Sequence, residues 1–386
     1  MKHHTSLFFA RFAPFALFAF LLFLSACGQT AVSLRDEGRA AQAAGDHAAA
    51  VAAFDEALRL DPELTAVYLD RGTSHAALGR YAEAVADYEQ ALAADPANAV
   101  AHNSLGFVRQ LTGDTAGALQ AYDQALALDP AYAAAYANRG LLYAQLGRTD
   151  AALADLSAAI DRGDTHPQLF LERARLYELQ GDPTAAIADL NRALSLDPAN
   201  AAAYTARGNL YRLRGDAERA LADYNQALAV DSVYVAAYLN RGLLFVQAGD
   251  VEAGLADYDR VLALDPQNAE GYANRGTAHL RLGSAAQAIA DLDQALALKP
   301  DFATAYVNRG AAHLQLGNPA QAIADLDQAL ALDPSIGVAY VTRAQAHAAA
   351  GSPAAAIADL QRYLTLEPDG PLRAQVEAQL EALQGE

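Results

Sequence analysis

The sequence predicts an all-α protein, an α-solenoid of about ten helix–turn–helix units that ends in a C-terminal capping helix. Two periodic signals predict this fold. Glycine recurs every 34 residues from Gly45 to Gly351 without a gap, and proline recurs at the same interval in eight of ten units, from Pro62 to Pro368. A fixed period of this size marks supersecondary units that stack on one another to bury a continuous core. We therefore assign residues 31–370 to ten units and number the positions of each unit from residue 31 onward.

The composition excludes several classes of function. The 386 residues are 53% hydrophobic, which argues against a disordered chain, and they carry a net charge of −19. A nucleic-acid surface needs a basic footprint, so we expect no nucleic-acid partner. The only lysines are Lys2 and Lys299, and neither lies in a phosphate-binding loop motif. Cys27 is the single cysteine, which excludes an intrachain disulfide and a cysteine zinc site, and we expect no metal and no cofactor.

Residues 1–26 have the features of an export signal. Lys2 and Arg11 are the only charged residues before position 35, and the apolar run over residues 12–24 is too short for a membrane span of about 20 residues. The run ends in Leu-Ser-Ala-Cys at residues 24–27, which resembles the bacterial lipobox. The resemblance implies cleavage before Cys27 and several acyl chains on its sulfur, which form a firm membrane anchor. The alternatives are an ordinary signal peptide and an uncleaved anchor.

Residues 27–30 are then expected to be the lipid anchor and a short linker. The three residues that follow Cys27 reach about 10 Å at most, so the solenoid is expected close to the bilayer. Gly28 stands where an aspartate would mark retention in the inner membrane. We expect an exported protein that is anchored to the outer membrane of a diderm bacterium, or otherwise to the outer face of the cell membrane.

Each unit is expected to be a pair of helices, and residues 235–268 illustrate it. The first helix, helix A, runs over Val235–Ala248 and ends at Gly249, which adopts the left-handed conformation without steric cost. Asp250 caps the second helix, helix B, and Pro266 lies just beyond its end. Eight units have Asp, Ser or Asn at this cap: Asp46, Asp114, Asp182, Asp216, Asp250, Ser284, Asn318 and Ser352.

Large and small residues alternate within each unit. Position 4 is an aromatic ring in eight units, and position 8 is glycine or alanine in all ten. Small residues let helix backbones approach, while the ring fills the space between neighbours. A 34-residue unit with this pattern is similar to the tetratricopeptide repeat. The resemblance implies a right-handed superhelix in which helix A lines a concave groove and positions 2, 5, 6, 9, 12 and 13 face inward. The capping helix is expected over residues 371–386, with an apolar face of Leu372, Val376, Leu380 and Leu383.

Two charged positions vary together. Position 7 is arginine and position 23 is aspartate in the same eight units, and both are missing in the other two. In an antiparallel helix pair that turns at position 15 these positions lie opposite each other, which predicts one ion pair per unit. The pairs are Arg71–Asp87, Arg139–Asp155, Arg173–Asp189, Arg207–Asp223, Arg241–Asp257, Arg275–Asp291, Arg309–Asp325 and Arg343–Asp359. We favour this structural role over a row of ligand-binding arginines.

The groove is where a partner is expected to bind. Position 6 is asparagine in four units, Asn138, Asn240, Asn274 and Asn308, and an amide offers a peptide backbone both a donor and an acceptor. The row resembles the asparagine ladder of O-linked N-acetylglucosamine transferase. Asn209 and Asn240 match two positions of the carboxylate clamp of co-chaperones, but the cations of that clamp are missing. Leu239, Leu243 and Val307 are apolar groove positions for side chains of the segment. The alternative is that position 6 merely tolerates polar residues.

These observations predict a membrane-anchored scaffold or adaptor, not an enzyme, that binds extended peptide segments of partner proteins in its groove. Cell-envelope assembly or secretion is the expected setting. No metalloprotease, serine-hydrolase, dinucleotide-binding or EF-hand motif occurs. Four histidines at position 11 are expected at the core edge and not at a metal: His75, His279, His313 and His347. The alternatives are an enzyme-associated regulator of cell-wall or polysaccharide machinery and a purely structural spacer.

Overall fold

The structure, a computed structural model, describes residues 30–385, and within them it contains 21 α-helices and no strand. The all-α prediction is confirmed. The expected export signal and Cys27 lie outside the described residues. None of the helices in this part of the chain is long and apolar enough to span a membrane.

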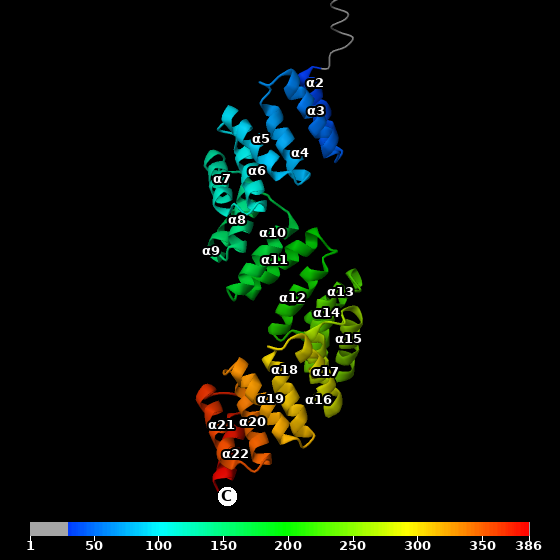
Figure 1. The fold of residues 1–386 in the computed structure, drawn as a ribbon, viewed down its shortest axis with the longest axis vertical. Helices are drawn as coiled ribbons and strands as arrows, with labels where there is room; N and C mark the ends of the chain where they lie inside the picture. The colour runs from blue at the N-terminus through cyan, green and yellow to red at the C-terminus, as the bar shows by residue number, and fades with distance from the viewer. Residues whose placement is uncertain (1–29, 386) are drawn as a thin grey trace, which may run out of the picture. The chain divides into compact units, whose positions relative to one another are not determined.

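The chain divides into two compact units, Met1–Gln180 and Gly181–Glu386. In each unit successive helices pack against each other as hairpins, and each helix A also touches the helix A of the next repeat (Figure 1). The helices of the first unit are α2 (Ala31–Ala43), α3 (His47–Leu60), α4 (Ala66–Ala77), α5 (Tyr81–Ala94), α6 (Ala99–Leu111), α7 (Thr115–Leu128), α8 (Ala133–Gln145), α9 (Thr149–Asp161) and α10 (Pro167–Leu179).

The second unit contains the other helices: α11 (Pro183–Leu196), α12 (Ala201–Leu213), α13 (Ala217–Val230), α14 (Val235–Ala248), α15 (Val251–Leu264), α16 (Ala269–Arg281), α17 (Ala285–Leu298), α18 (Ala303–Gln315), α19 (Pro319–Leu332), α20 (Gly337–Ala349), α21 (Pro353–Leu366) and α22 (Arg373–Gln384). Between α14 and α15, Gly249 has a φ of 92°, in the left-handed region that suits glycine. Helix α14 begins and ends at the residues expected from the sequence, and α15 ends two residues before Pro266.

The residue that precedes helix B forms the predicted side-chain cap only where it is an aspartate. Asp46, Asp114, Asp182, Asp216 and Asp250 each accept a hydrogen bond from a backbone N–H of the first turn. Ser284, Asn318 and Ser352 make no such side-chain bond, so the expectation is wrong for these three. A neutral residue can cap a helix in this chain, since Asn98, Asn200 and Asn268 accept such bonds at the start of helix A.

The glycine at position 8 makes room for the residue at position 24 of its own repeat. Tyr258 is 1% exposed, and a Cβ atom added at Gly242 would lie 2.8 Å from its Cε1 atom. The ring at position 4, Tyr238, packs instead with small residues of the preceding repeat, Ala201 and Ala227. Each repeat therefore has two large groups that are matched to small ones, one within it and one between neighbours.

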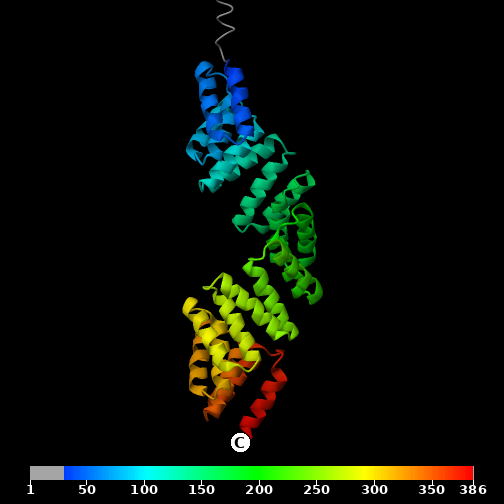
Figure 2. The same ribbon diagram turned by 90° about the vertical axis from the view of Figure 1, so that its right-hand side faces the viewer.

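The C-terminal helix α22 covers the end of the second unit. Its Val376 is fully buried, and Leu372, Leu380 and Leu383 pack against the core cluster formed by α18 to α21. Figure 2 shows this helix in red beside the last repeat. The four residues are those of the expected apolar face, so α22 shields the core of the last repeat from water.

Candidate binding groove

The position-7 arginines are held by ion pairs and hydrogen bonds within the fold. Arg241 donates from Nε and Nη2 to the two carboxylate oxygens of Asp257, at 2.8 and 2.7 Å. It also donates from Nη1 to Asn225 of the preceding repeat at 2.6 Å. The hydrogen bonds to Asp257 raise the pKa of Arg241 above its ordinary value, so it stays charged. Tyr238 and Phe245 lie 5.5 and 5.8 Å from the guanidinium, at cation–π distance.

The same arrangement recurs at seven of the eight predicted pairs: Arg71–Asp87, Arg139–Asp155, Arg207–Asp223, Arg241–Asp257, Arg275–Asp291, Arg309–Asp325 and Arg343–Asp359. Arg173 and Asp189 belong to different units, and their pair stays a prediction. The second bond, to position 25 of the preceding repeat, was not expected. Its signal in the sequence is a row of short polar residues: Asp55, Asp123, Ser157, Asn191, Asn225, Asp259, Asp293 and Asp327.

The position-11 histidines lie beside the carboxylates of these pairs. His75 is 8% exposed, and its Nε2 lies 3.8 Å from an oxygen of Asp87. His279, His313 and His347 stand at 3.8 to 3.9 Å from the equivalent aspartates. Among residues 30–385 no group of three His, Cys, Asp or Glu side chains could hold a metal ion. These imidazoles are therefore neighbours of the buried ion pairs.

The asparagine row of the second unit does not form a continuous network. Asn240 donates to the carbonyl oxygen of Ala236 in its own helix at 2.8 Å, and Asn308 donates to Thr277 Oγ1 at 2.9 Å. Asn274 makes no side-chain hydrogen bond with the described residues. All three asparagines are half-buried. Their role in binding stays a prediction.

The other predicted groove residues of the second unit differ in accessibility. Asn209 is half-buried, and its Oδ1 accepts a hydrogen bond from the hydroxyl of Tyr224 at 2.7 Å. Leu239 and Leu243 are half-buried, and Leu239 packs against a core cluster. Val307 is only 6% exposed and belongs to the core, so its expected place in the groove is wrong. Position 5 lies between helices when the neighbouring repeat packs closely over it.

Asn138 lines a cavity of about 530 Å³ in the first unit. Three successive helices of type A contribute to it: α6, α8 and α10. The lining residues are Phe107, Gln110, Leu111, Asn138, Leu141, Gln145, Gln168, Glu172 and Arg175. They occupy positions 9, 12 and 13 of α6, positions 6, 9 and 13 of α8 and positions 2, 6 and 9 of α10. All of these positions were expected to face inward, and together they trace a diagonal across the three helices.

Two hydrogen-bond chains orient the side-chain amides of this cavity. The buried Tyr122 donates its hydroxyl to Gln110 Oε1 at 2.9 Å, and Gln110 Nε2 donates to Gln145 Oε1 at 3.3 Å. Burial raises the pKa of Tyr122 well above its ordinary value, which keeps it a donor. On the other side, Asn138 Nδ2 donates to Asn103 Oδ1 at 3.0 Å. No pattern in the sequence indicates these hydrogen-bond chains, because they join position 12 to position 24 and to the next repeat.

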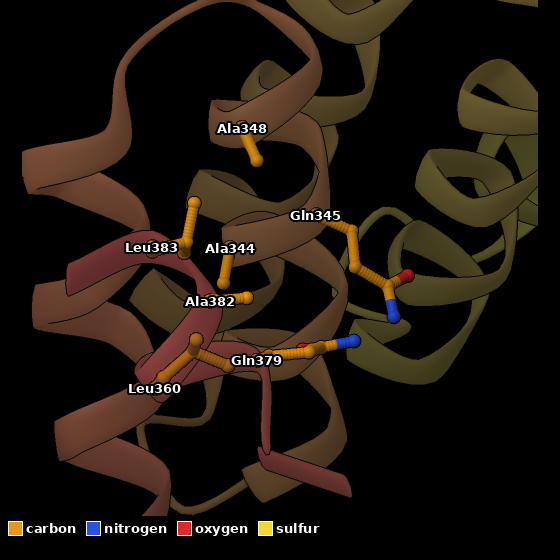
Figure 3. A pocket seen from close by; sticks show the side chains of 7 residues that line it. All are labelled: Ala344, Gln345, Ala348, Leu360, Gln379, Ala382 and Leu383. Carbon is orange, nitrogen blue, oxygen red and sulfur yellow. The ribbon is translucent and has the colours of Figure 1, made fainter. Parts of the chain in front are cut away.

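A second, smaller cavity of about 310 Å³ lies at the C-terminal end of the second unit. Its lining residues are Ala344, Gln345, Ala348, Leu360, Gln379, Ala382 and Leu383, from α20, α21 and α22. Figure 3 shows the amides of Gln345 and Gln379 on one side of this pocket and the apolar side chains on the other. The cavity lies where α22 packs beside α20 and α21.

One family model of the tetratricopeptide repeat matches residues 273–335 and 312–371. A second tetratricopeptide repeat model matches residues 37–64 and 133–162. A further TPR repeat model matches 74–113, 111–147, 174–213, 208–249 and 242–283. The chain belongs to the tetratricopeptide repeat family. Its helical pairs are the repeats of that family, and their glycine and proline positions set the helix ends described above.

Solved structures with the same fold share little sequence with this tetratricopeptide repeat chain. A tetratricopeptide repeat protein from Parabacteroides merdae is 20% identical with a TM-score of 0.53, over 64% of this chain and 97% of that one. The Cut9–Hcn1 hetero-tetramer of the APC/C matches at 14% identity and a TM-score of 0.54, over 96% and 99%. PilW, a type IV pilus biogenesis factor, is 20% identical with a TM-score of 0.50, over 56% of this chain and 98% of that one. No match is found among curated proteins.

Proposed function

We propose that the protein is a scaffold that binds an extended segment of a partner protein in the cavity formed by α6, α8 and α10. Membership of the tetratricopeptide repeat family supports the general class, a protein-interaction scaffold. The cavity carries the more specific proposal. Phe107 is 45% exposed and Leu111 is 48% exposed, and both lie beside the side-chain amides of Gln110 and Gln145. Exposed apolar side chains with a polar rim are typical of a binding surface.

The diagonal course of the lining residues favours an extended segment over a compact ligand. The lining begins near the C-terminal end of α6, crosses the middle of α8 and ends near the start of α10. An extended chain advances about 3.3 Å per residue and alternates its side chains, so it meets apolar and amide groups in turn along such a track. The amides of Asn138 and Gln145 supply an acceptor and a donor for its backbone.

We further propose that acyl chains on Cys27 hold this scaffold at the membrane of a bacterial envelope, the outer membrane where there is one. The lipobox-like residues 24–27 support this anchor. The partner would then be another component of envelope assembly or secretion. Changing Cys27→Ser tests the anchor in the expressing bacterium. We expect loss of labelled palmitate and release from the membrane fraction, and retention of both would contradict it.

Site-specific crosslinking tests the binding site. A photo-reactive amino acid in place of Leu141 should crosslink the partner in intact envelopes. The same group in place of Gln124, which is exposed on the helix B face of α7, should not. Adding Asn138→Ala and Gln145→Ala should abolish the crosslink at position 141, with helicity unchanged by circular dichroism. A crosslink that survives these changes, or that forms equally at position 124, would contradict the proposed site.

A further inference from the structure

The cavity of the first unit has no net charge, although the chain carries −19. Its only charged lining residues are Glu172 and Arg175, and these bind each other. Arg175 Nε donates to Glu172 Oε1 at 3.0 Å, and this bond raises the pKa of Arg175 above its ordinary value. The remaining lining residues are carboxamides and apolar side chains. A charged group that enters this cavity would lose water and find no unpaired partner.

The arginines of the neighbouring groove surface are also paired with a carboxylate. Asp70 accepts hydrogen bonds from the Nε atoms of Arg35 and of Arg39, both at 2.8 Å. These three residues lie on α2 and α4 and do not line the cavity. The groove arginines of this unit are therefore held by carboxylates, whereas Asp36 on α2 and Glu178 on α10 are exposed, make no ion pair with the described residues and do not line the cavity.

The carboxamides of Asn138 and Gln145 keep groups that are free to bond a ligand, as does the exposed Gln168, which makes no side-chain hydrogen bond with the described residues. Asn138 uses its amino group on Asn103, so its Oδ1 remains available as an acceptor. Gln145 uses its Oε1 to accept from Gln110, so its amino group remains available as a donor. Neutral amides of this kind match the peptide groups of a backbone and add no charge preference.

The cavity at the end of the second unit has the same chemistry. Gln345 and Gln379 form its polar side, and leucine and alanine side chains form the rest, with no charged residue (Figure 3). Two cavities that are formed by different helices are thus both lined by apolar side chains together with carboxamides. Neither lining carries a net charge.

From these contacts we infer that the segment bound by the first unit is uncharged and inserts one large apolar side chain between Phe107, Leu111 and Leu141. This inference rests on the proposed function and adds the chemistry of the segment. The inserted side chain removes the exposed surface of Phe107 and Leu111 from water. The backbone of the segment forms hydrogen bonds with Asn138 and Gln145. The partner is a protein with an extended neutral stretch, and not one with an acidic or basic tail.

A set of labelled nine-residue peptides of alternating serine and alanine tests this chemistry by fluorescence anisotropy with the full chain in detergent. The peptides differ only in the central residue, which is leucine, phenylalanine, alanine, aspartate or arginine. We expect the leucine and phenylalanine peptides to bind at least tenfold more tightly than the other three. Tighter or equal binding of the aspartate or arginine peptide overturns the inference and leaves the proposed function standing. Absence of binding by every peptide contradicts both.

Releasing the paired arginine gives a second, independent measurement. Glu172→Gln frees Arg175 and should strengthen binding of the aspartate peptide about tenfold, while the leucine peptide binds as before. The matched control is Asp70→Asn, which frees Arg35 and Arg39 outside the cavity and should leave the preference unchanged. If Glu172→Gln does not alter the preference, or if Asp70→Asn alters it equally, the neutrality of the cavity does not select the segment.

Discussion

The Arg241–Asp257 pair gives the sharpest test of how a repeat is held together. The side chain of Asp257 is 7% exposed, so Arg241→Ala leaves a buried carboxylate without its charged partner. Removing one member of a buried pair costs about 3–5 kcal/mol. Asp257→Ala leaves Arg241, whose side chain is already 21% exposed in the intact pair, with its hydrogen bond to Asn225 at 2.6 Å. The loss of unfolding free energy caused by Asp257→Ala is therefore expected near the lower end of that range.

The two changes together should cost less than their sum, because both remove the same interaction. We expect a coupling energy of about 2 kcal/mol from the double-mutant cycle. Urea unfolding followed by circular dichroism measures the free energies. Repeat arrays can unfold in steps, so hydrogen exchange of α14 and α15 should locate the loss.

An exposed pair on the same chain serves as the control. Arg373 and Glu377 lie one turn apart on α22, with side chains 51% and 47% exposed. Such pairs couple by about 0.3–0.5 kcal/mol. A coupling energy for Arg241 and Asp257 no larger than that of the control would refute the reasoning that burial makes their pair a structural link.

Other features of the repeats lead to three further predictions. Gly242→Ala would bring a Cβ atom to 2.8 Å from Tyr258 Cε1 and should cost about 1–3 kcal/mol in urea unfolding. Adding Tyr258→Leu should recover much of that loss, because the last repeat has alanine and leucine at these positions. Burial raises the pKa of Tyr258 above its ordinary value of about 10, so the unfolding free energy should fall as pH rises beyond that value, and Tyr258→Phe should flatten the fall. Val376→Asp would bury an unpaired carboxylate and should speed hydrogen exchange throughout α22, whereas Gln375→Asp, at an exposed position, should not.

The sequence was sufficient to place the helices because their ends are set locally. Gly249 and Pro266 act on the backbone within a few residues, and α14 and α15 end where these residues require. The partner of Arg241 within the repeat was also predictable, since positions 7 and 23 change together. These features depend on one helix pair, which a single repeat already specifies.

Features that depend on two neighbouring repeats were harder to predict. The bond from Arg241 to Asn225 joins successive repeats, and the polar residue at position 25 varies between aspartate, asparagine and serine. Val307 was expected in the groove, but its exposure depends on how closely the next repeat packs over it. The orientation of Gln145 is set by a bond to Gln110 on another helix. None of these outcomes follows from the pattern of one repeat.

The hydrogen bonds of the position-7 arginines have a consequence for how such a chain can change in length. Seven of these arginines reach one partner 16 residues ahead and one 16 residues behind, as Arg309 does with Asp325 and Asp293. Deletion of residues 269–302 would bring Asp259 to the place that Asp293 now has, and Arg309 would keep both bonds. Insertion of a whole repeat would do the same. Repeats can thus be gained or lost by recombination as interchangeable blocks, whereas a cut of any other length would leave arginines and carboxylates without partners.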